Sequence, residues 1–450
     1  MTVDFDLRSN YVQIINGKSS PTALTRHGLN PATLEALPEV PVATPKDLDN
    51  AADAAKAAFK IWSATPYEDR KKAVLAYADA IDQYSDQFRD LLITEQGKPS
   101  FQATLETTNS INWIRGMAAL PLLEDIIEDD DTRTVVTRHV PLGVVGAIVP
   151  WNFPLLLATG KIAPALLTGN VIIVKPSRKP FAPYCGLKLV ELAQKFFPPG
   201  VVQSLSGDDD LGPWLTSHPA IDKISFTGST ATGKRVLQSA SRTLKRVTLE
   251  LGGNDPAIVF PDVDIEKVAE KVAFFAFLNS GQVCLNLKRI YVHSSIFDEF
   301  KDALVRQVKS YTVGDGSKTE SPTGLFKTTC NTRASRPSST ISRSRAGRLL
   351  RVVGLSLRLG TWSLPPSLTD RLIIPESWLK SHLVQLYLPL SWDDEAEVIE
   401  RANNSSMGLG ASIWTADRDR AARVARQIQA GTVWTNDHFS LSSHRSFWWS

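Results

Sequence analysis

The chain of 450 residues has only three cysteines, and none of its apolar runs approaches the ~18 residues that a membrane-spanning helix needs. Three cysteines are too few for a disulfide framework and leave one over, which fits free thiols in a reducing compartment. The first residues are acidic and lack the charged-then-apolar pattern of a secretory leader. These absences argue against membrane and secreted proteins and predict a cytoplasmic one.

Acidic residues are missing from one long segment. Residues 321–369 contain no Asp or Glu but eight Lys or Arg, from Lys327 to Arg358. Without these eight, 42 basic residues face 47 acidic ones, so the rest of the chain is mildly acidic. The positive net charge of +3 therefore comes from this one segment. Since the rest of the chain is not basic, we expect no nucleic-acid partner for the chain as a whole.

Hydrophobic residues make up 43% of the chain and charged residues 22%, as in a soluble enzyme large enough for two or three domains. Helical spacing dominates residues 45–115, including a helix over residues 69–89. From residue 144, apolar strands alternate with helices of about a dozen residues, which predicts a doubly wound parallel sheet. The expected strands cover residues 144–149, 171–174, 201–205, 223–226 and 247–250, and the expected helices residues 155–167, 184–196 and 232–239.

A second α/β unit is expected from about residue 255. Its predicted helices cover residues 265–277, 296–311, 393–403 and 417–429, and its predicted strands residues 289–293, 410–414 and 431–434. Ligands of such sheets bind beyond the carboxyl ends of the strands. We therefore expect the chemistry to lie in the turns that follow them.

Two glycine-marked turns carry a thiol and a carboxylate. Residues 279–284 read Asn-Ser-Gly-Gln-Val-Cys, and Cys284 follows Glu250 of Leu-Glu-Leu-Gly-Gly-Asn (249–254) by 34 residues. A thiol with a separate base is typical of nucleophilic catalysis, provided that nearby donors lower the pKa of the thiol. A lone cysteine is more often a packing residue, and Cys185, on the apolar face of a predicted helix, is interpreted so.

Two further stretches, Pro-Trp-Asn-Phe-Pro at residues 150–154 and Phe-Thr-Gly-Ser at residues 226–229, precede these turns. In this order the four stretches resemble the NAD(P)-dependent aldehyde dehydrogenase family, over roughly residues 10–315 and again 390–438. The resemblance implies oxidation of a small-molecule aldehyde to a carboxylic acid. It also implies a nucleotide-binding domain over residues 1–252, with an oligomerisation arm at 121–140, and a catalytic domain over residues 253–438.

The resemblance assigns a role to each catalytic candidate. Cys284 would be the nucleophile, Asn152 would donate to the oxyanion together with the backbone N–H of Cys284, and Glu250 would activate water. Phe153 would line the aldehyde tunnel, with Trp113 and Met117 nearby. Taken singly, Asn152 also fits an ordinary turn residue and Glu250 an exposed strand end. No metal site is expected.

The cofactor implied is NAD, with NADP possible. Gly228 and Gly233 would let a pyrophosphate approach the start of a helix, and Lys175 would contact the adenosine ribose. Arg178 and Lys179 stand where many NAD-preferring members of the family have a glutamate, and they fit either a 2′-phosphate or a solvent-facing insertion. The cofactor-binding candidates are Trp151, Lys175, Ser177, Gly228, Ser229, Gly233 and Leu251.

Two stretches depart from the family pattern: residues 325–391 and the tail 439–450. The first fits either a genuine basic insert or replacement of the family's content by a shifted frame or exon. The unchanged spacing of the flanking motifs favours replacement. The family's Glu-x-Phe-Gly-Pro motif, which holds the nicotinamide ribose, is absent here. We therefore weigh an impaired relative with a compromised homo-oligomer as the alternative function, and nucleic-acid binding through residues 333–358 as a third.

Overall fold

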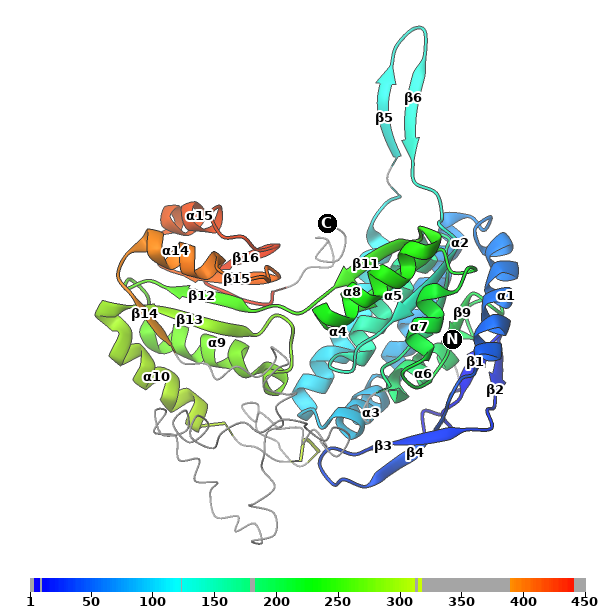
Figure 1. Cartoon of the computed structure of the whole chain (residues 1–450), viewed down its shortest axis with the longest axis horizontal. Coiled ribbons are helices and arrows are strands. Elements are labelled where there is room, and N and C mark those ends of the chain that lie inside the picture. Colours follow the sequence, from blue (N-terminus) through cyan, green and yellow to red (C-terminus); the bar gives the residue numbers. More distant parts are fainter. Residues whose placement is uncertain are drawn as a thin grey trace.

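The computed structural model describes residues 4–8, 10–122, 124–178, 183–311, 315–317 and 389–440. Two sheets, each with helices packed on it, form the two bodies seen in Figure 1. The predicted departures at residues 325–391 and 439–450 lie almost wholly outside the described residues, as does Lys179.

The first sheet has seven strands in the order β11-β10-β7-β8-β9-β1-β2. The run from β11 to β9 is parallel, and β1 and β2 add an antiparallel edge. Its strands are β1 (Gln13–Ile15), β2 (Lys18–Ser20), β7 (Val144–Ile148), β8 (Val171–Lys175), β9 (Val202–Ser204), β10 (Lys223–Thr227) and β11 (Arg246–Glu250). This is the doubly wound parallel sheet that the alternating pattern predicted.

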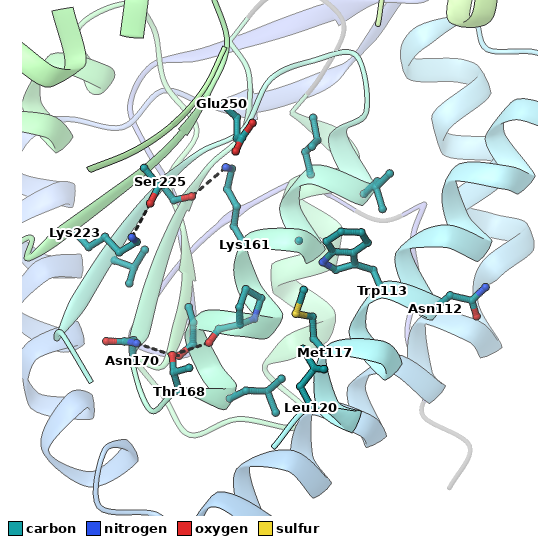
Figure 2. Close-up of a pocket in the computed structure, with 18 of the residues that line it drawn as sticks. Asn112, Trp113, Met117, Leu120, Lys161, Thr168, Asn170, Lys223, Ser225 and Glu250 are labelled. Carbon is teal, nitrogen blue, oxygen red and sulfur yellow. Dashed lines mark hydrogen bonds between the residues drawn. The ribbon is translucent and has the colours of Figure 1, made fainter. Parts of the chain in front are cut away.

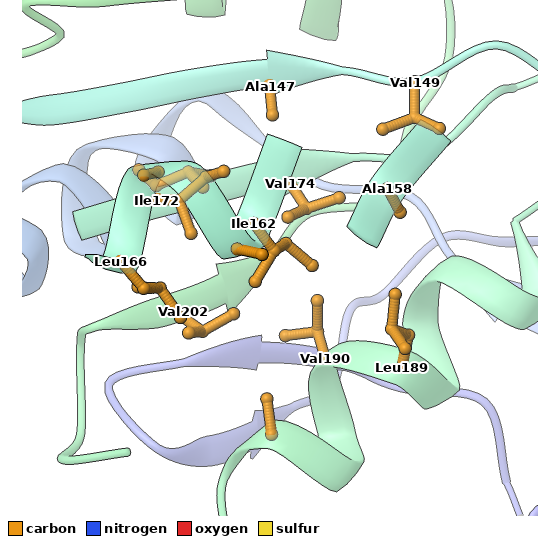
Figure 3. Close-up of a cluster of buried hydrophobic side chains, with 14 of the residues drawn as sticks. Ala147, Val149, Ala158, Ile162, Leu166, Ile172, Val174, Leu189, Val190 and Val202 are labelled. Carbon is orange, nitrogen blue, oxygen red and sulfur yellow. The ribbon is translucent and has the colours of Figure 1, made fainter. Parts of the chain in front are cut away.

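Apolar side chains of β7, β8 and β9 pack with those of two helices, and all positions labelled in Figure 3 are buried. Val174, Ile162 and Val190 represent the strand and the two helices in this core. The helices of this body are α1 (Pro45–Trp62), α2 (Tyr67–Gln83), α3 (Ser85–Gln96), α4 (Ser100–Ala119), α5 (Pro154–Leu167), α6 (Tyr184–Ala193), α7 (Leu211–Ser217) and α8 (Thr230–Ala240), with a 3₁₀ turn η1 (Ser241–Thr243).

The second sheet has five parallel strands in the order β14-β13-β12-β15-β16. The chain passes into it through residues 251–254, directly after β11. Its strands are β12 (Asp255–Val259), β13 (Leu287–His293), β14 (Leu390–Trp392), β15 (Gly410–Trp414) and β16 (Thr432–Thr435). Its helices are α9 (Ile265–Phe277), α10 (Phe297–Lys309), α14 (Glu395–Asn403) and α15 (Arg418–Ala425), with 3₁₀ turns η2 (Leu278–Gly281) and η3 (Ser294–Ile296).

Two antiparallel hairpins stand outside these sheets: β3 (Thr25–Leu29) with β4 (Ala36–Pro41), and β5 (Glu124–Asp129) with β6 (Thr134–Arg138). The second hairpin projects from the body and corresponds to the predicted arm at residues 121–140 (Figure 1). Its side chains Ile126 and Ile127 are exposed by 64% and 65%. No helix among the described residues is long and apolar enough to cross a bilayer.

Several predicted helices differ from the structure by up to three residues at one or both ends, and two differ by more. The helix expected over residues 69–89 is interrupted at Tyr84, whose ring stacks edge-on against Phe5 and whose hydroxyl accepts a hydrogen bond from the Phe5 N–H. The helix expected over residues 417–429 ends at Ala425. There the Gln427 carbonyl and the Gln429 N–H bind the side chain of Asn403. In both places tertiary contacts outweigh local helical spacing.

Candidate active site

Cys284 follows a turn with unusual backbone geometry. Asn279, Ser280 and Gly281 all have positive φ, at 52°, 58° and 73°, a conformation that residues other than glycine rarely adopt. The buried Asn286 stabilises this turn, because its side chain accepts the Val283 N–H at 2.6 Å and donates to the Leu278 carbonyl at 3.2 Å. The thiol is therefore held on a rigid turn between η2 and β13.

Asn152 lies between β7 and α5 and is bonded to the same turn. Its side-chain amide donates to the Gln282 carbonyl at 2.8 Å, and the Asn279 amide donates to the Asn152 carbonyl at 3.2 Å. An amide nitrogen carries two N–H groups, so the first bond leaves one donor for another acceptor. The structure thus bonds the predicted oxyanion donor to the turn that carries the predicted nucleophile.

Burial raises the pKa of the Cys284 thiol to about 12, and the nearby carboxyls of Asp255 and Glu250 act in the same direction. Lys288 opposes them. Nucleophilic attack at neutral pH was expected on condition that nearby donors lower the pKa of the thiol. The resting arrangement does not meet this condition, because burial and negative charge outweigh the single cation.

Glu250 ends β11 and is half-buried. Burial raises the pKa of its carboxyl to about 7, and the charge of Lys161 partly offsets this. Figure 2 shows the Lys161 side chain reaching toward Glu250 from α5. The Lys161 ammonium donates to Ser225 Oγ at 3.1 Å and to Thr227 Oγ1 at 2.8 Å, and burial lowers its pKa to about 8. A carboxyl with a pKa near 7 suits a general base at neutral pH.

The predicted cofactor residues gather at the carboxyl edge of the first sheet. Trp151 follows β7, Lys175 ends β8, and Ser177 lies two residues further on. The Gly228–Ser229 turn follows β10, and Leu251 follows β11. Neighbouring parallel strands end at one edge, so the topology brings these residues together.

The two glycines of this group have a packing role that the sequence did not predict. A Cβ at Gly233 would lie 2.5 Å from Leu251 Cδ2, and one at Gly228 would lie 2.6 Å from the Phe226 ring. Ser229 caps α8 by accepting the Thr232 N–H at 3.3 Å. Gly233 therefore permits close packing of α8 on the Leu251 side chain, and the turn places the start of α8 at the sheet edge.

Three cations lie near the end of β8. Burial lowers the pKa of Lys175 to about 8, and the charges of Arg26 and Arg178 lower it further. Arg178 forms an ion pair with Asp209 at 2.5 Å. Its guanidinium is thus already engaged by a carboxylate, a feature that bears on the predicted choice between NAD and NADP.

A cavity of about 1410 Å³ runs between α4, α5 and the β10–β11 wall, with Glu250 in its lining. Trp113 and Met117, expected near the aldehyde, line this cavity together with Phe439 (Figure 2 labels the first two). Phe153 is not among its lining residues; its ring packs against Phe439, with centroids 6.4 Å apart. The predicted tunnel residue thus contacts a residue of the cavity wall and does not itself line the cavity.

The sequence interpretation missed two residues of this site. Lys161 is the only charged residue in the apolar stretch of α5, and an isolated charge in such a stretch could have indicated a functional residue. Asn286 is a single buried amide between apolar neighbours. Nothing in the sequence indicates that its hydrogen bonds stabilise the thiol turn. In the described part of the chain no group of His, Cys, Asp or Glu could hold a metal ion.

A model of a known protein family matches most of the chain. The sequence model of the aldehyde dehydrogenase family matches residues 19–331 and 388–447. The gap between the two matches falls within the segment predicted to depart. The second match extends nine residues past the limit of 438 that the motifs indicated, so part of the tail predicted to be aberrant still aligns.

Individual relatives agree with this match. The chain is 39% identical to a putative aldehyde dehydrogenase FUS7 of Gibberella fujikuroi, over 95% of this chain and 90% of the relative. It is also 39% identical to an aldehyde dehydrogenase LUC3 of a Fusarium species, with the same coverage. Among solved structures, a putative aldehyde dehydrogenase from Burkholderia cenocepacia superposes with a TM-score of 0.81 at 30% identity, covering 96% and 90% of the two chains. An aldehyde dehydrogenase from Bacillus cereus in complex with NAD+ gives 0.81 at 29%, covering 98% and 92%.

Proposed function

Since the chain belongs to the aldehyde dehydrogenase family, we propose that it oxidises an aldehyde to the carboxylic acid through a covalent adduct on Cys284. The observation that carries this proposal is the bond from the Asn152 amide to the Gln282 carbonyl, at 2.8 Å, two residues before the thiol. An oxyanion donor and a nucleophile fixed to one rigid turn are suited to carbonyl addition.

In the first step the sulfur of Cys284 bonds to the aldehyde carbon, and the carbonyl electrons move onto oxygen. The second N–H of the Asn152 amide stabilises that oxyanion, a contribution of about 3 kcal/mol. Because the thiol is neutral at rest, its proton must leave as the sulfur attacks. Glu250, with a pKa near 7, is the acceptor that the site offers.

After oxidation the acyl group is a thioester on Cys284. Glu250, which has released the thiol proton to solvent, removes a proton from water; the water oxygen attacks the thioester carbon, the C–S bond breaks, and the leaving sulfur takes up the proton from Glu250. The products are the carboxylic acid and the free thiol. The Lys161 ammonium stabilises the ionised form of Glu250 between these events.

A nicotinamide dinucleotide, when bound, supplies the hydride acceptor for the oxidation. The described residues fit this group: the start of α8 presents backbone N–H groups at the sheet edge for the diphosphate, and the buried Lys175, which ends β8 at the same edge, would contact the adenosine ribose. An NAD+ complex exists for the Bacillus cereus relative. We propose NAD as the cofactor, with NADP as the alternative that the Arg178 variants below distinguish.

The remaining assignments are proposals of the same kind. Residues 1–252 would bind the dinucleotide and residues 253–438 would carry the thiol. The β5–β6 hairpin, with Ile126 and Ile127 exposed, would pair with further copies of the chain. The impaired relative remains the second candidate, because the stretch 378–387 lacks the family's Glu-x-Phe-Gly-Pro motif.

The test is aldehyde oxidation by the purified full chain, followed through reduced nicotinamide with NAD+ and NADP+ and a series of aliphatic and aromatic aldehydes. Cys284→Ala and Glu250→Gln should abolish turnover, whereas Cys185→Ala, at a buried thiol outside the site, should retain it. Turnover that survives Cys284→Ala would refute the mechanism. A chain that forms the Cys284 thioester from an activated ester but never reduces the nucleotide would be the impaired relative.

A further inference from the structure

A buried ion pair lies behind the segment that carries Asn152. Lys98 donates from its ammonium to Glu106 Oε2, and the two side chains are only 1% and 0% exposed. Gly97, with φ of 72°, ends α3, and α4 begins at Ser100, so the corner between the helices brings the two residues together. Neither residue belongs to the catalytic set assigned above.

Glu106 uses its second oxygen on the start of α5. Its Oε1 accepts the N–H groups of Leu155 and Leu156, at 3.0 and 3.2 Å. These are two of the backbone donors that a helix N-terminus leaves without partners, and a carboxylate there also interacts favourably with the helix dipole. The helix that begins at Pro154, two residues after Asn152, is therefore fixed to Glu106.

Lys98 holds the residue in between. Its ammonium lies 3.7 Å from the centroid of the Phe153 ring, a cation–π contact inside the protein. One ion pair thus anchors the segment immediately after Asn152, while the bonds to Gln282 and Asn279 anchor Asn152 itself. The side chain is held between the ion pair on one side and the thiol turn on the other.

A buried ion pair contributes little to net stability, because desolvation of the two charges offsets their attraction. The position of this ion pair is better explained by the groups that it orients, the start of α5 and the Phe153 ring. We propose that Lys98 and Glu106 are positioning residues that hold the Asn152 amide at the place where the oxyanion forms. This proposal rests on the proposed function, since it takes Asn152 as the oxyanion donor.

Two reactions of the same thiol separate positioning from general damage. Acylation by p-nitrophenyl acetate forms a C–S bond and expels p-nitrophenolate, and it passes through an oxyanion. Alkylation by iodoacetamide forms a C–S bond and expels iodide, and it forms no oxyanion. Neither reaction needs a nucleotide. The ratio of the two rates therefore reports on the oxyanion donor and is insensitive to exposure of the thiol.

The variants are Glu106→Gln, which keeps an acceptor for α5 but removes the charge, and the neutral pair Lys98→Met/Glu106→Gln. The double variant leaves no buried charge unpaired, so it preserves the fold if the single one does not. The matched control is Lys188→Met, a fully buried lysine paired with Glu191 at 2.8 Å in another part of the core. Thermal denaturation of each protein verifies folding.

We expect acylation to fall about tenfold to a hundredfold in both variants, the scale of a donor displaced by about 1 Å. Alkylation should change less than about threefold, as befits a reaction that needs no oxyanion donor. Lys188→Met should leave the ratio unchanged. A folded double variant with an unchanged ratio, or equal falls in both rates, would overturn the positioning role alone. A wild-type chain that is alkylated but never acylated would refute the proposed function, and the positioning role with it.

Discussion

The side-chain amide of Asn152 donates to the backbone carbonyl of Gln282 at 2.8 Å, across 130 positions of sequence. This bond joins the loop after β7, in the first sheet, to the thiol turn that precedes β13 in the second. Displacement of either sheet would move the donor away from the sulfur. The proposed catalytic geometry therefore depends on how the two sheets meet as well as on the residues themselves.

Replacing Asn152 by Ala should lower the rate of Cys284 acylation by about 10²- to 10³-fold, because one oxyanion donor is lost. Alkylation by iodoacetamide should persist, since that reaction forms no oxyanion. Rapid-mixing measurements of both reactions give the comparison. Equal loss of both would show that the substitution disturbs the thiol turn and would argue against a donor role.

Thioester hydrolysis should increase as pH rises through about 7, because Glu250 acts as a base only when ionised and its pKa is raised to about 7. Lys161 lowers that pKa, so Lys161→Met should move the midpoint of the profile to higher pH. Deacylation of the acetyl enzyme measured from pH 5 to 9 gives both midpoints. A midpoint that stays in place in Lys161→Met would mean that the cation does not act on Glu250.

The strands and helices around this site were predictable because their apolar patterns are local. The parallel direction of β7, β8, β10 and β11 follows from their alternation with helices, and that direction brings Lys175 and Gly228 to one edge. The motif resemblance identified Cys284, Glu250 and Asn152 as candidates for one site.

What the sequence could not predict depends on surroundings assembled from distant segments. The raised pKa of Cys284 arises from burial and from Asp255 and Glu250, which reach it only in the folded chain. The packing role of Gly233 arises from Leu251, eighteen residues later. The break at Tyr84 arises from a contact with Phe5 near the N-terminus. In each case the deciding contact is long-range and leaves no periodic signal.

Arg178 and Asp209 give a two-sided test of cofactor choice. If Arg178 recognises a 2′-phosphate, Arg178→Glu should lower the preference for NADP over NAD by about tenfold, the loss of one charge-assisted contact. Asp209→Asn removes the carboxylate that engages Arg178 at 2.5 Å, so it should raise that preference. The ratio of kcat/KM for the two nucleotides is the measurement. If this ratio is unchanged in both variants, Arg178 faces solvent and pairs only with Asp209.

Lys288 and Asp255 should shift the reactivity of Cys284 in opposite directions. Lys288 lowers the pKa of the thiol and Asp255 raises it, although burial is the larger cause. Lys288→Met should therefore slow alkylation at pH 8 by about threefold to tenfold, since each pKa unit changes the thiolate fraction tenfold.

Asp255→Asn should not slow alkylation, because it removes a carboxyl that raises the pKa of the Cys284 thiol. Mass spectrometry of the labelled peptide assigns the reaction to Cys284, and Cys185→Ala provides a background without the second described thiol. If both substitutions slow the reaction equally, the effect comes from loss of buried packing around the thiol turn. Opposite shifts would instead show that local charge sets how readily this thiol ionises.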